Sequence, residues 1–158
     1  EGIAKLAKTV VDSYYSNPNV KRGKSPQVTI SVACFIPKPF TPFQWEAQDT
    51  IEMLEEKQHW LREAITDRKI RYTWHDARVS RIEAVFARGD RRLSAALLEA
   101  HRRGRRFDAW DEYFDYDEWL DIFASVGIDP AFYANRKFSC DPPVGCYRLR
   151  REEELLCA

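Results

Sequence analysis

His75 and Asp76 stand side by side directly after a short alternating segment that contains Ile70, Tyr72 and Trp74. The loop after a strand is a frequent place for catalytic groups, because the strand holds it in position. A histidine next to a carboxylate can serve as a general acid or base, or can orient a substrate. Asp76 can alternatively cap a helix that starts after it. The sequence therefore offers His75 and Asp76 as candidates for an acid/base or orienting role.

The other two histidines carry no comparable signal. His59 lies in a predicted helix next to Trp60, and His101 lies near an arginine-rich helix end. We expect both to be solvated surface positions, because neither fits a zinc-binding motif. The chain also contains no glycine-rich phosphate loop, no Ser-His-Asp order and no HExxH motif. The residues alone therefore do not define a reaction.

Arginine is concentrated in one part of the chain. Nine arginines lie between positions 78 and 106, and seven acidic residues without a basic one lie between positions 108 and 121. Guanidinium groups bind phosphate in a bidentate manner, so Arg91, Arg92, Arg102 and Arg103 form a candidate anion patch for phosphate or RNA. The alternative is that the two charged runs pair with each other or are simply solvated. The acidic run argues against a free nucleic-acid surface.

Cysteine spacing argues against a metal site in this chain. Cys34 falls on the apolar face of a predicted strand, where a free cysteine behaves as a small core residue. Cys140, Cys146 and Cys157 lie in a polar tail, at gaps that match no zinc or cluster motif. With no secretory signal, we expect a reduced, cytoplasmic setting.

Composition narrows the class of protein further. A chain of 158 residues can form one domain with its own core, and 13% aromatic residues argue against disorder. The 25 basic and 25 acidic residues balance, so no overall field favours nucleic acid or a membrane. No apolar run reaches the ~20 residues of a membrane span. Because residue 1 is glutamate rather than methionine, we expect a processed or excised piece.

Strict alternation predicts a strand over residues 28–36. Its apolar face consists of Val28, Ile30, Val32, Cys34 and Ile36, and its opposite face of Thr29, Ser31, Ala33 and Phe35. We expect helices to cover the apolar face, whereas the mostly small opposite face suits the lining of a cavity. The prolines of PKPFTPFQW then end strand pairing and hold an extended aromatic loop. A strand that ends in such a loop is a usual place for a ligand in α/β proteins.

Helices are predicted on both sides of this strand. Apolar spacing predicts one over residues 2–16. Residues 41–44 have the form of a capping box, which predicts that the next helix opens there and runs to about Ile65. Residues 70–74 are predicted as a short strand.

The second half of the sequence is predicted to be helical. A capping box at residues 80–83 opens a helix that ends at Gly89. Asp90 is predicted to cap the next helix, and Asp115 is predicted to open one more. Asp129 and Pro130 are predicted to start a final short turn through Tyr133. The buried face of the helix after Asp90 is expected to consist of Leu93, Ala96, Leu97 and Ala100.

Four separated segments together resemble one known family. They are FIPKPFTPFQW at 35–45 with the amphipathic helix after it, YTWHDARVSRIEAVFARGDRRL at 72–93, FDAWDEYFDYDEW at 107–119 and GIDPAFYANR at 127–136. These segments resemble the C-terminal part of a bacterial family of radical SAM proteins that carry a cobalamin-binding-like domain ahead of the radical SAM core. The resemblance covers roughly residues 1–139. The cluster motif of the family, CxxxCxxC, has no match here, and the tail from Asp141 does not resemble the family.

The resemblance implies an enzyme that reductively cleaves S-adenosylmethionine at a [4Fe-4S] cluster to make a 5′-deoxyadenosyl radical. It makes cobalamin a possible further cofactor without deciding whether it is bound. The cofactor supplies that chemistry and the protein positions it. The rest of the barrel, with the cluster ligands, would lie upstream in the same polypeptide, so this chain alone is expected to be inactive. The positions that would face SAM or substrate are Thr29, Ser31, Ala33, Phe35, Pro37, Lys38, Thr41 and Gln44. Lys38 would meet a carboxylate or phosphate there, or would be a solvated rim lysine.

We therefore predict an α/β fold in three parts. Residues 1–66 would form the last helix–strand–helix portion of a partial (β/α)6 barrel of the TIM type, with 28–36 as its last strand. Residues 67–139 would form a mainly helical extension, and residues 140–158 an irregular tail. The alternative is a non-catalytic helical module that binds RNA or protein through its arginine-rich face. A CxxxCxxC motif about one barrel's length upstream of Glu1 would decide for the enzyme.

Overall fold

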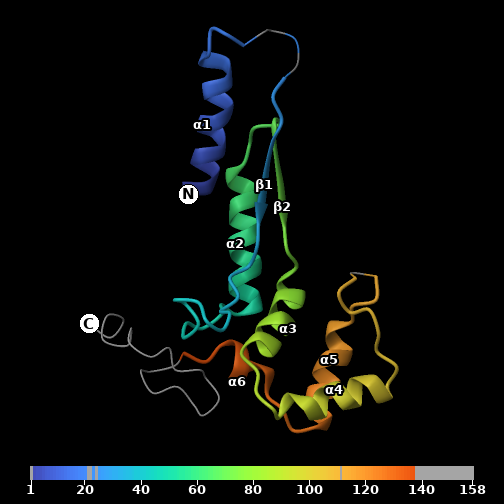
Figure 1. The fold of residues 1–158 in the computed structure, drawn as a ribbon. Helices are drawn as coiled ribbons and strands as arrows, with labels where there is room; N and C mark the ends of the chain where they lie inside the picture. The colour runs from blue at the N-terminus through green and yellow to red at the C-terminus, as the bar shows by residue number, and fades with distance from the viewer. Residues whose placement is uncertain (1, 21–22, 24, 111, 138–158) are drawn as a thin grey trace, which may run out of the picture. The chain divides into compact units, whose positions relative to one another are not determined.

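Two parallel strands and the helices around them form the first of two compact units in the computed structural model (Figure 1). The structure describes residues 2–20, 23, 25–110 and 112–137, so the predicted tail with Cys140, Cys146 and Cys157 lies outside the described residues. The first unit lies within residues 1–34 and 51–76, and the second within residues 35–50 and 77–158. The predicted boundary between residues 66 and 67 therefore falls inside the first unit.

The first unit contains α1 (Gly2–Ser16), β1 (Val28–Val32), α2 (Ile51–Ala64) and β2 (Ile70–Trp74). The strands pair in parallel, in a register that runs from Val28 opposite Ile70 to Val32 opposite Trp74. A parallel pair needs a crossover connection, and α2 supplies it. The predicted α/β class is therefore confirmed, and the predicted short strand at residues 70–74 forms a parallel neighbour of β1.

β1 ends at Val32, whereas the sequence predicted a strand up to Ile36. The partner strand sets this length. β2 ends at Trp74 and the chain turns into a helix at Ala77, so no strand of the described residues lies beside residues 33–36. Alternation alone predicts an extended segment, but a strand also needs a paired neighbour.

The predicted facing of β1 is confirmed. Val28 and Ile30 pack against a cluster formed by Ala7 and Val11 of α1 and Ile70 of β2. The residues between them, at positions 29 and 31, are exposed. Removing an aliphatic side chain from water contributes about 1.5–3 kcal/mol when burial is complete, so this face of the sheet holds α1 in place.

α2 covers the same face of the sheet as α1. Gln58 Nε2 donates to Cys34 Sγ at 3.3 Å, and the Arg62 guanidinium lies 4.4 Å from the centre of the Trp74 ring. Trp74 stands opposite Val32 in the register and shares its face. Both helices therefore lie on one face of the strand pair, and the other face carries no helix from the described part of this unit.

The start of α2 corrects the sequence prediction, because the helix begins at Ile51 and not near residue 41. A capping box needs the side chain of its fourth residue to accept from the backbone N–H of its first residue. Here the Gln44 Oε1 accepts from the Phe40 N–H at 3.2 Å, and the Thr41 hydroxyl donates to the Lys38 carbonyl at 2.7 Å. Both side chains therefore stabilise a local turn, and no helix starts at residue 41.

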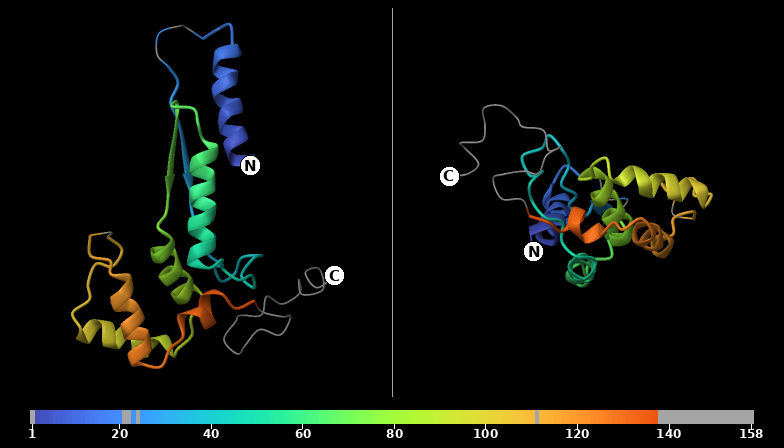
Figure 2. Two further views of the ribbon diagram at one scale, coloured as in Figure 1. Left: turned by 180° about the vertical axis from the view of Figure 1, so that it is seen from behind. Right: turned by 90° about the horizontal axis from the view of Figure 1, so that it is seen from below.

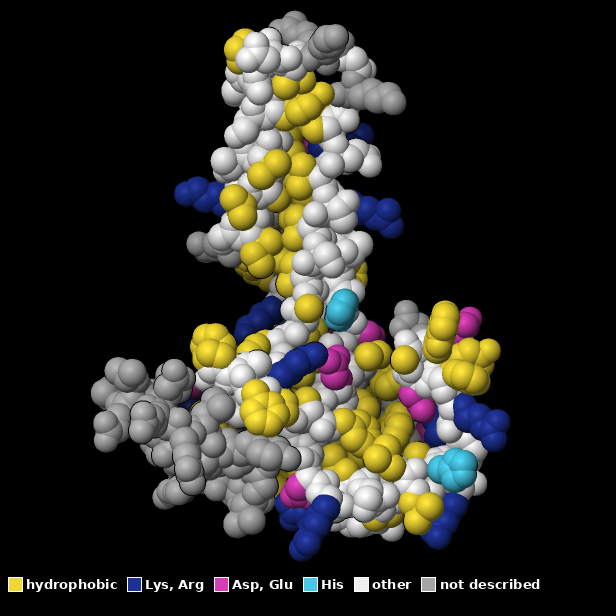
Figure 3. Space-filling view, in the orientation of Figure 1, with side chains coloured by type: hydrophobic (Ala, Val, Ile, Leu, Met, Phe, Trp, Pro, Cys, Tyr) yellow, Lys and Arg dark blue, Asp and Glu magenta, His cyan; other side chains and the backbone are white. Residues whose placement is uncertain are grey.

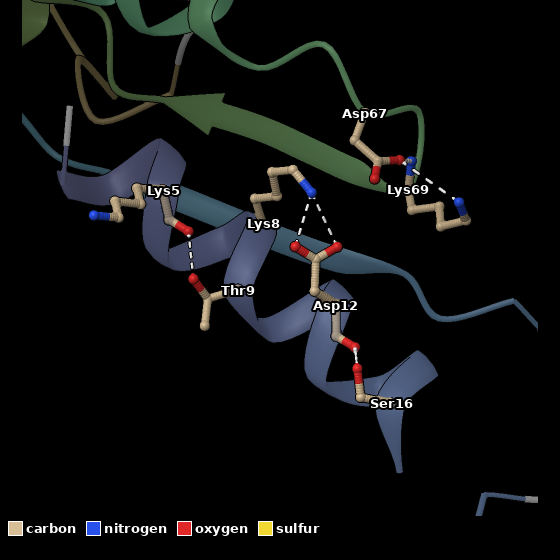
Figure 4. Close-up of polar contacts among 7 residues, drawn as sticks. All are labelled: Lys5, Lys8, Thr9, Asp12, Ser16, Asp67 and Lys69. Carbon is tan, nitrogen blue, oxygen red and sulfur yellow. Dashed lines mark hydrogen bonds and ion pairs between the residues drawn. The ribbon is translucent and has the colours of Figure 1, made fainter. Parts of the chain in front are cut away.

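The outward side of α1 is polar along part of its length (Figure 4). Lys8 and Asp12 form an ion pair at 2.8 Å one helical turn apart, and the Thr9 hydroxyl donates to the Lys5 carbonyl at 2.9 Å. The adjacent turn before β2 is closed by Asp67, whose carboxylate accepts from the Lys69 N–H at 2.9 Å. These contacts are exposed and contribute little to stability, so the apolar face decides the position of α1.

The second unit contains α3 (Ala77–Ala87), α4 (Leu93–Arg102), α5 (Tyr116–Ser125) and α6 (Pro130–Ala134). α5 packs against both α3 and α4, and α6 packs against α3 (Figure 2). Their shared core is built around the fully buried Val85, Ile122 and Phe123. Phe86 joins it through an edge-to-face contact with Trp119, with ring centres 5.4 Å apart.

The predicted cap of α5 is confirmed, and the turn predicted to start at Asp129 is the short helix α6. Asp115 accepts from the Glu118 N–H at 3.0 Å, and Asp129 accepts from the Ala131 N–H at 2.9 Å. Gly127 follows α5 with a φ of 69°, a left-handed conformation that glycine adopts without strain. Local side-chain chemistry is therefore enough to fix these helix ends.

Three details of the second unit differ from the prediction. α3 begins at Ala77, one turn before the predicted capping box, because the buried Ser80 is already helical. Asp90 bonds to the Arg92 N–H at 2.9 Å in a turn that precedes α4, which then begins at Leu93. Leu97, predicted to be buried, is 53% exposed, because α5 covers the side of α4 that carries Leu93 and Ala96.

These positions predict how two substitutions differ. Phe123→Ala should lower the free energy of unfolding by about 3–5 kcal/mol, because it opens a cavity in the centre of the core. Leu97→Ala, a truncation on an exposed helix face, should change it by less than about 0.5 kcal/mol. Urea denaturation of both variants measures this difference, and equal losses would contradict the assigned core.

Candidate functional site

The open face of the strand pair carries the first three predicted site residues. Thr29, Ser31 and Ala33 are all exposed on it. Across the register, Arg71 lies beside Thr29 and Thr73 beside Ser31. This face therefore offers hydroxyl groups and one guanidinium, which can hydrogen-bond to a polar or anionic ligand. It contains no pair of groups suited to acid/base catalysis.

The outer edge of β1 is unpaired by any strand of the described residues. The Val28 N–H donates to the Lys69 carbonyl just before β2, and the Val32 carbonyl accepts from the His75 N–H just after it, so both groups are directed toward the β2 side. In a parallel ladder the N–H and C=O of one residue point to the same side and alternate along the strand. The backbone groups of Thr29 and Ser31 therefore point away from β2. Two N–H and two C=O groups are thus presented in line along this edge.

The remaining predicted site residues, from Phe35 to Gln44, belong to the second unit and are described within it. Phe35 is 43% exposed and lies edge-on to Phe43, whereas Pro37 and Gln44 are buried. Lys38 forms an ion pair with Glu83 of α3 at 3.0 Å, with both side chains about half exposed.

The aromatic loop of residues 35–45 is held by its own polar groups. The Gln44 N–H donates to the Thr41 carbonyl at 3.1 Å, and the Gln44 amide oxygen fixes Phe40 in a left-handed conformation, with a φ of 64°. Thr41 and Gln44 therefore support the loop, while Phe40 and Phe43 extend from it with 59% and 63% of their surface exposed.

His75 and Asp76 lie at the end of β2, as predicted, and both are exposed. The His75 N–H donates to the Val32 carbonyl at 3.3 Å, and its carbonyl accepts from Gln58 Nε2 at 2.9 Å. Both contacts involve the backbone of His75, and its imidazole takes part in neither of them. Asp76 directly precedes α3, which is the position that the capping alternative requires.

A buried polar network that the sequence did not predict centres on Gln48, whose residue surface is 2% exposed. Its side-chain amide donates to the Phe35 carbonyl at 3.2 Å and to the Ser80 carbonyl at 3.0 Å. Its backbone N–H donates to the Ala134 carbonyl at 2.9 Å, and its backbone carbonyl accepts from Asn135 Nδ2 at 2.8 Å. One residue thus joins the loop, α3 and the end of α6.

Two arginines complete this network. Arg81 donates to the side-chain oxygen of Asn135, and Arg88 donates to the Ala134 carbonyl at 2.8 Å and to the Arg136 carbonyl. Buried hydrogen bonds of a charged donor are stronger than those of neutral groups. Both residues belong to the arginine-rich run of the sequence, but their guanidinium groups form hydrogen bonds inside the second unit.

The four arginines of the predicted anion patch are exposed, and three of them have acidic partners. Arg92 forms a bidentate pair with Asp90, with a shortest distance of 2.6 Å. Arg103 pairs with Glu99 at 2.9 Å, and Arg102 lies 3.9 Å from the same carboxylate. Arg91 is exposed as well. Salt bridges within α4 and its preceding turn therefore offset much of the predicted positive patch.

The described residues contain no group of three or more His, Cys, Asp and Glu side chains placed to hold a metal ion. Within the described ranges no helix combines the length and the apolar character needed to cross a membrane. Comparison of the chain with protein families, with curated proteins and with solved structures finds no match.

Asp90 provides a test of the network around α4. Hydrogen bonds from Arg92 lower the pKa of the Asp90 carboxyl to about 2. The ionised carboxylate is therefore favoured more in the folded state than in the unfolded state. Its contribution to stability is complete above the unfolded pKa of about 4 and is lost as pH falls through about 2.

Asp90→Asn should therefore lower the free energy of unfolding by about 1 kcal/mol at pH 7, where the turn and the ion pair are both intact. The difference from the wild type should shrink below pH 4 and vanish near pH 2. Thermal unfolding at several pH values measures it, with the exposed Asp121→Asn as a control. A difference that stays constant from pH 7 to pH 2 would contradict the assigned ion pair.

Proposed function

We propose that this chain forms the C-terminal portion of a radical SAM enzyme. In this proposal α1, β1, α2 and β2 belong to a partial (β/α)6 barrel of the TIM type, and the second unit is a helical extension. The observation that carries the proposal is that two parallel strands have both helices on one face. Helices of a (β/α) barrel all cover the outside of the strands, whereas helices of a doubly wound sheet cover both faces.

The side chains on the open face support a position at a barrel lumen. Thr29, Ser31 and Ala33 are small and uncharged, and they are exposed in this unit. Small side chains on an inward face leave room for a ligand, whereas large branched ones fill a barrel interior. In the proposal these three residues face SAM or substrate, and Phe35, Pro37, Lys38, Thr41 and Gln44 belong to the rim.

The edge of β1 and the surface of α1 support a continuation of the sheet. Parallel strands are normally paired and covered on both sides, and an uncharged open edge promotes aggregation. α1 also exposes the apolar Ile3, Leu6 and Val10, with 46%, 66% and 49% of their surface accessible. The proposed partner of both features is the rest of the barrel, upstream in the same polypeptide.

The described residues do not fit the [4Fe-4S] cluster that such an enzyme needs. A cluster of this class is held by three thiolates and keeps one iron open for SAM, but Cys34 is the one cysteine within the described ranges. Cys34 is half-buried and accepts a hydrogen bond from Gln58. The proposal therefore assigns the cluster ligands to residues outside this chain and limits the role of this chain to shaping the barrel.

The alternative class is a non-catalytic helical module that binds RNA or protein through its arginine-rich face. The pairing of Arg92 and Arg103 with neighbouring carboxylates weakens the RNA version of this alternative. The alternative class predicts that no longer polypeptide containing this chain cleaves SAM.

The proposal predicts opposite results for two preparations. After anaerobic reconstitution with iron and sulfide, residues 1–158 alone should bind no stoichiometric cluster and release no 5′-deoxyadenosine from SAM. A polypeptide that also includes the upstream coding sequence should do both when a reductant is supplied. Absorption spectra and chromatography of the nucleoside measure the two outcomes. A folded longer polypeptide without cluster and without SAM cleavage would contradict the proposal and favour the alternative.

A further inference from the structure

The loop between α4 and α5 exposes three aromatic side chains. Phe107, Trp110 and Tyr113 have 66%, 62% and 54% of their surface accessible. Large apolar side chains scattered singly on a surface are ordinary, but a group of them on one loop marks a binding surface. In Figure 3 hydrophobic side chains stand out from the surface over this loop, with acidic and basic side chains beside them.

A buried arginine holds this loop in shape. Arg105 has 12% of its side chain exposed and donates to Glu118 at 2.9 Å, to the Tyr113 carbonyl at 2.7 Å and to Asp108. These bonds tie the two ends of the loop to each other and to the first turn of α5. The aromatic rings are therefore presented by a pre-formed loop, which lowers the entropy cost of binding.

The backbone of the loop keeps the rings outside the core. Phe107 adopts a φ of 63°, a left-handed conformation that is uncommon for a residue with a large side chain. Successive turns follow, in which the Trp110 N–H donates to the Phe107 carbonyl and the Tyr113 N–H donates to the Trp110 carbonyl, both at 2.9 Å. The Phe107 and Tyr113 rings lie 5.9 Å apart and form one surface.

The charges next to these rings are mostly negative, with the exposed Arg106 beside Phe107 as a basic exception. No lysine or arginine occurs between Arg106 and Arg136 in the sequence. Glu112, Asp115 and Asp117 are exposed on the loop and the first turn of α5, and Arg105 is occupied by its own two carboxylates. This arrangement repels phosphate groups, so it disfavours a nucleic acid in spite of the aromatic rings.

We propose that the aromatic surface of Phe107, Trp110 and Tyr113 binds a basic segment of a partner protein, with lysine or arginine side chains placed over the rings. A cation over the face of an aromatic ring is attracted by the ring quadrupole, and tryptophan is the strongest such ring. The flanking carboxylates attract the same cations and set the salt dependence of binding. This proposal concerns the second unit alone and does not rest on the proposed SAM chemistry.

The test uses the chain of residues 1–158 and a labelled eight-residue peptide of alternating arginine and glycine. Fluorescence anisotropy should show saturable binding that weakens with salt. Trp110→Ala should weaken it by about 10-fold, Trp110→Phe by less, and Glu112→Gln together with Asp117→Asn should weaken it and flatten its salt dependence. Trp60→Ala is the matched control, because Trp60 is a tryptophan of α2 that is 45% exposed.

Several results would overturn this proposal. One is equal binding of the peptide by Trp110→Ala and by the wild type, with circular dichroism showing both to be folded. Another is tighter binding of a single-stranded oligouridine than of the arginine peptide. A third is self-association of the chain that Trp110→Ala abolishes, without any binding of the peptide. A failure of SAM cleavage leaves these readouts unaffected, so the two proposals can fail separately.

Discussion

Pairing of the backbone groups of β1 is the constraint on which the first unit depends. Each residue of a parallel strand directs its N–H and C=O to one neighbour, so β2 can satisfy only alternate residues of β1. The two helices cover the apolar face through Val11 and Arg62, and neither reaches the other face. One edge and one face therefore remain without a partner within the described residues, and the proposal of a barrel rests on that imbalance.

Burial of polar groups gives the second unit its framework. Gln48 is nearly inaccessible and binds carbonyls from the loop at Phe35 and from α3. A buried carbonyl without a donor costs about 1–3 kcal/mol, so these bonds specify one arrangement of the chain segments. Arg105 has the same role in the loop after α4. The exposed aromatic side chains of both loops are therefore held on rigid supports.

Periodicity and local capping were sufficient to predict much of the fold. The two faces of β1, the extent of α1 and the cap at Asp115 follow from neighbouring residues, and the structure agrees with them. The turn predicted to start at Asp129 is a short helix that this residue caps. The capping box at residues 41–44 was wrong, because Gln44 finds a donor at Phe40 that sequence spacing does not reveal. Gln48 and Arg105 were missed for a related reason, since their partners depend on tertiary packing. The site roles of Thr29, Ser31 and Ala33 stay predictions.

Hydrogen exchange at the outer edge of β1 tests the central claim most directly. The account predicts that the Thr29 and Ser31 amides exchange rapidly in residues 1–158 alone, because their N–H groups point away from β2. In a polypeptide that includes the upstream coding sequence, the same amides should slow by at least about 100-fold, as paired core strands do. The Ile30 amide, directed toward β2, is the internal control and should be protected in both. Rapid exchange of Thr29 and Ser31 in the longer folded polypeptide would contradict the claim that β1 belongs to a larger parallel barrel.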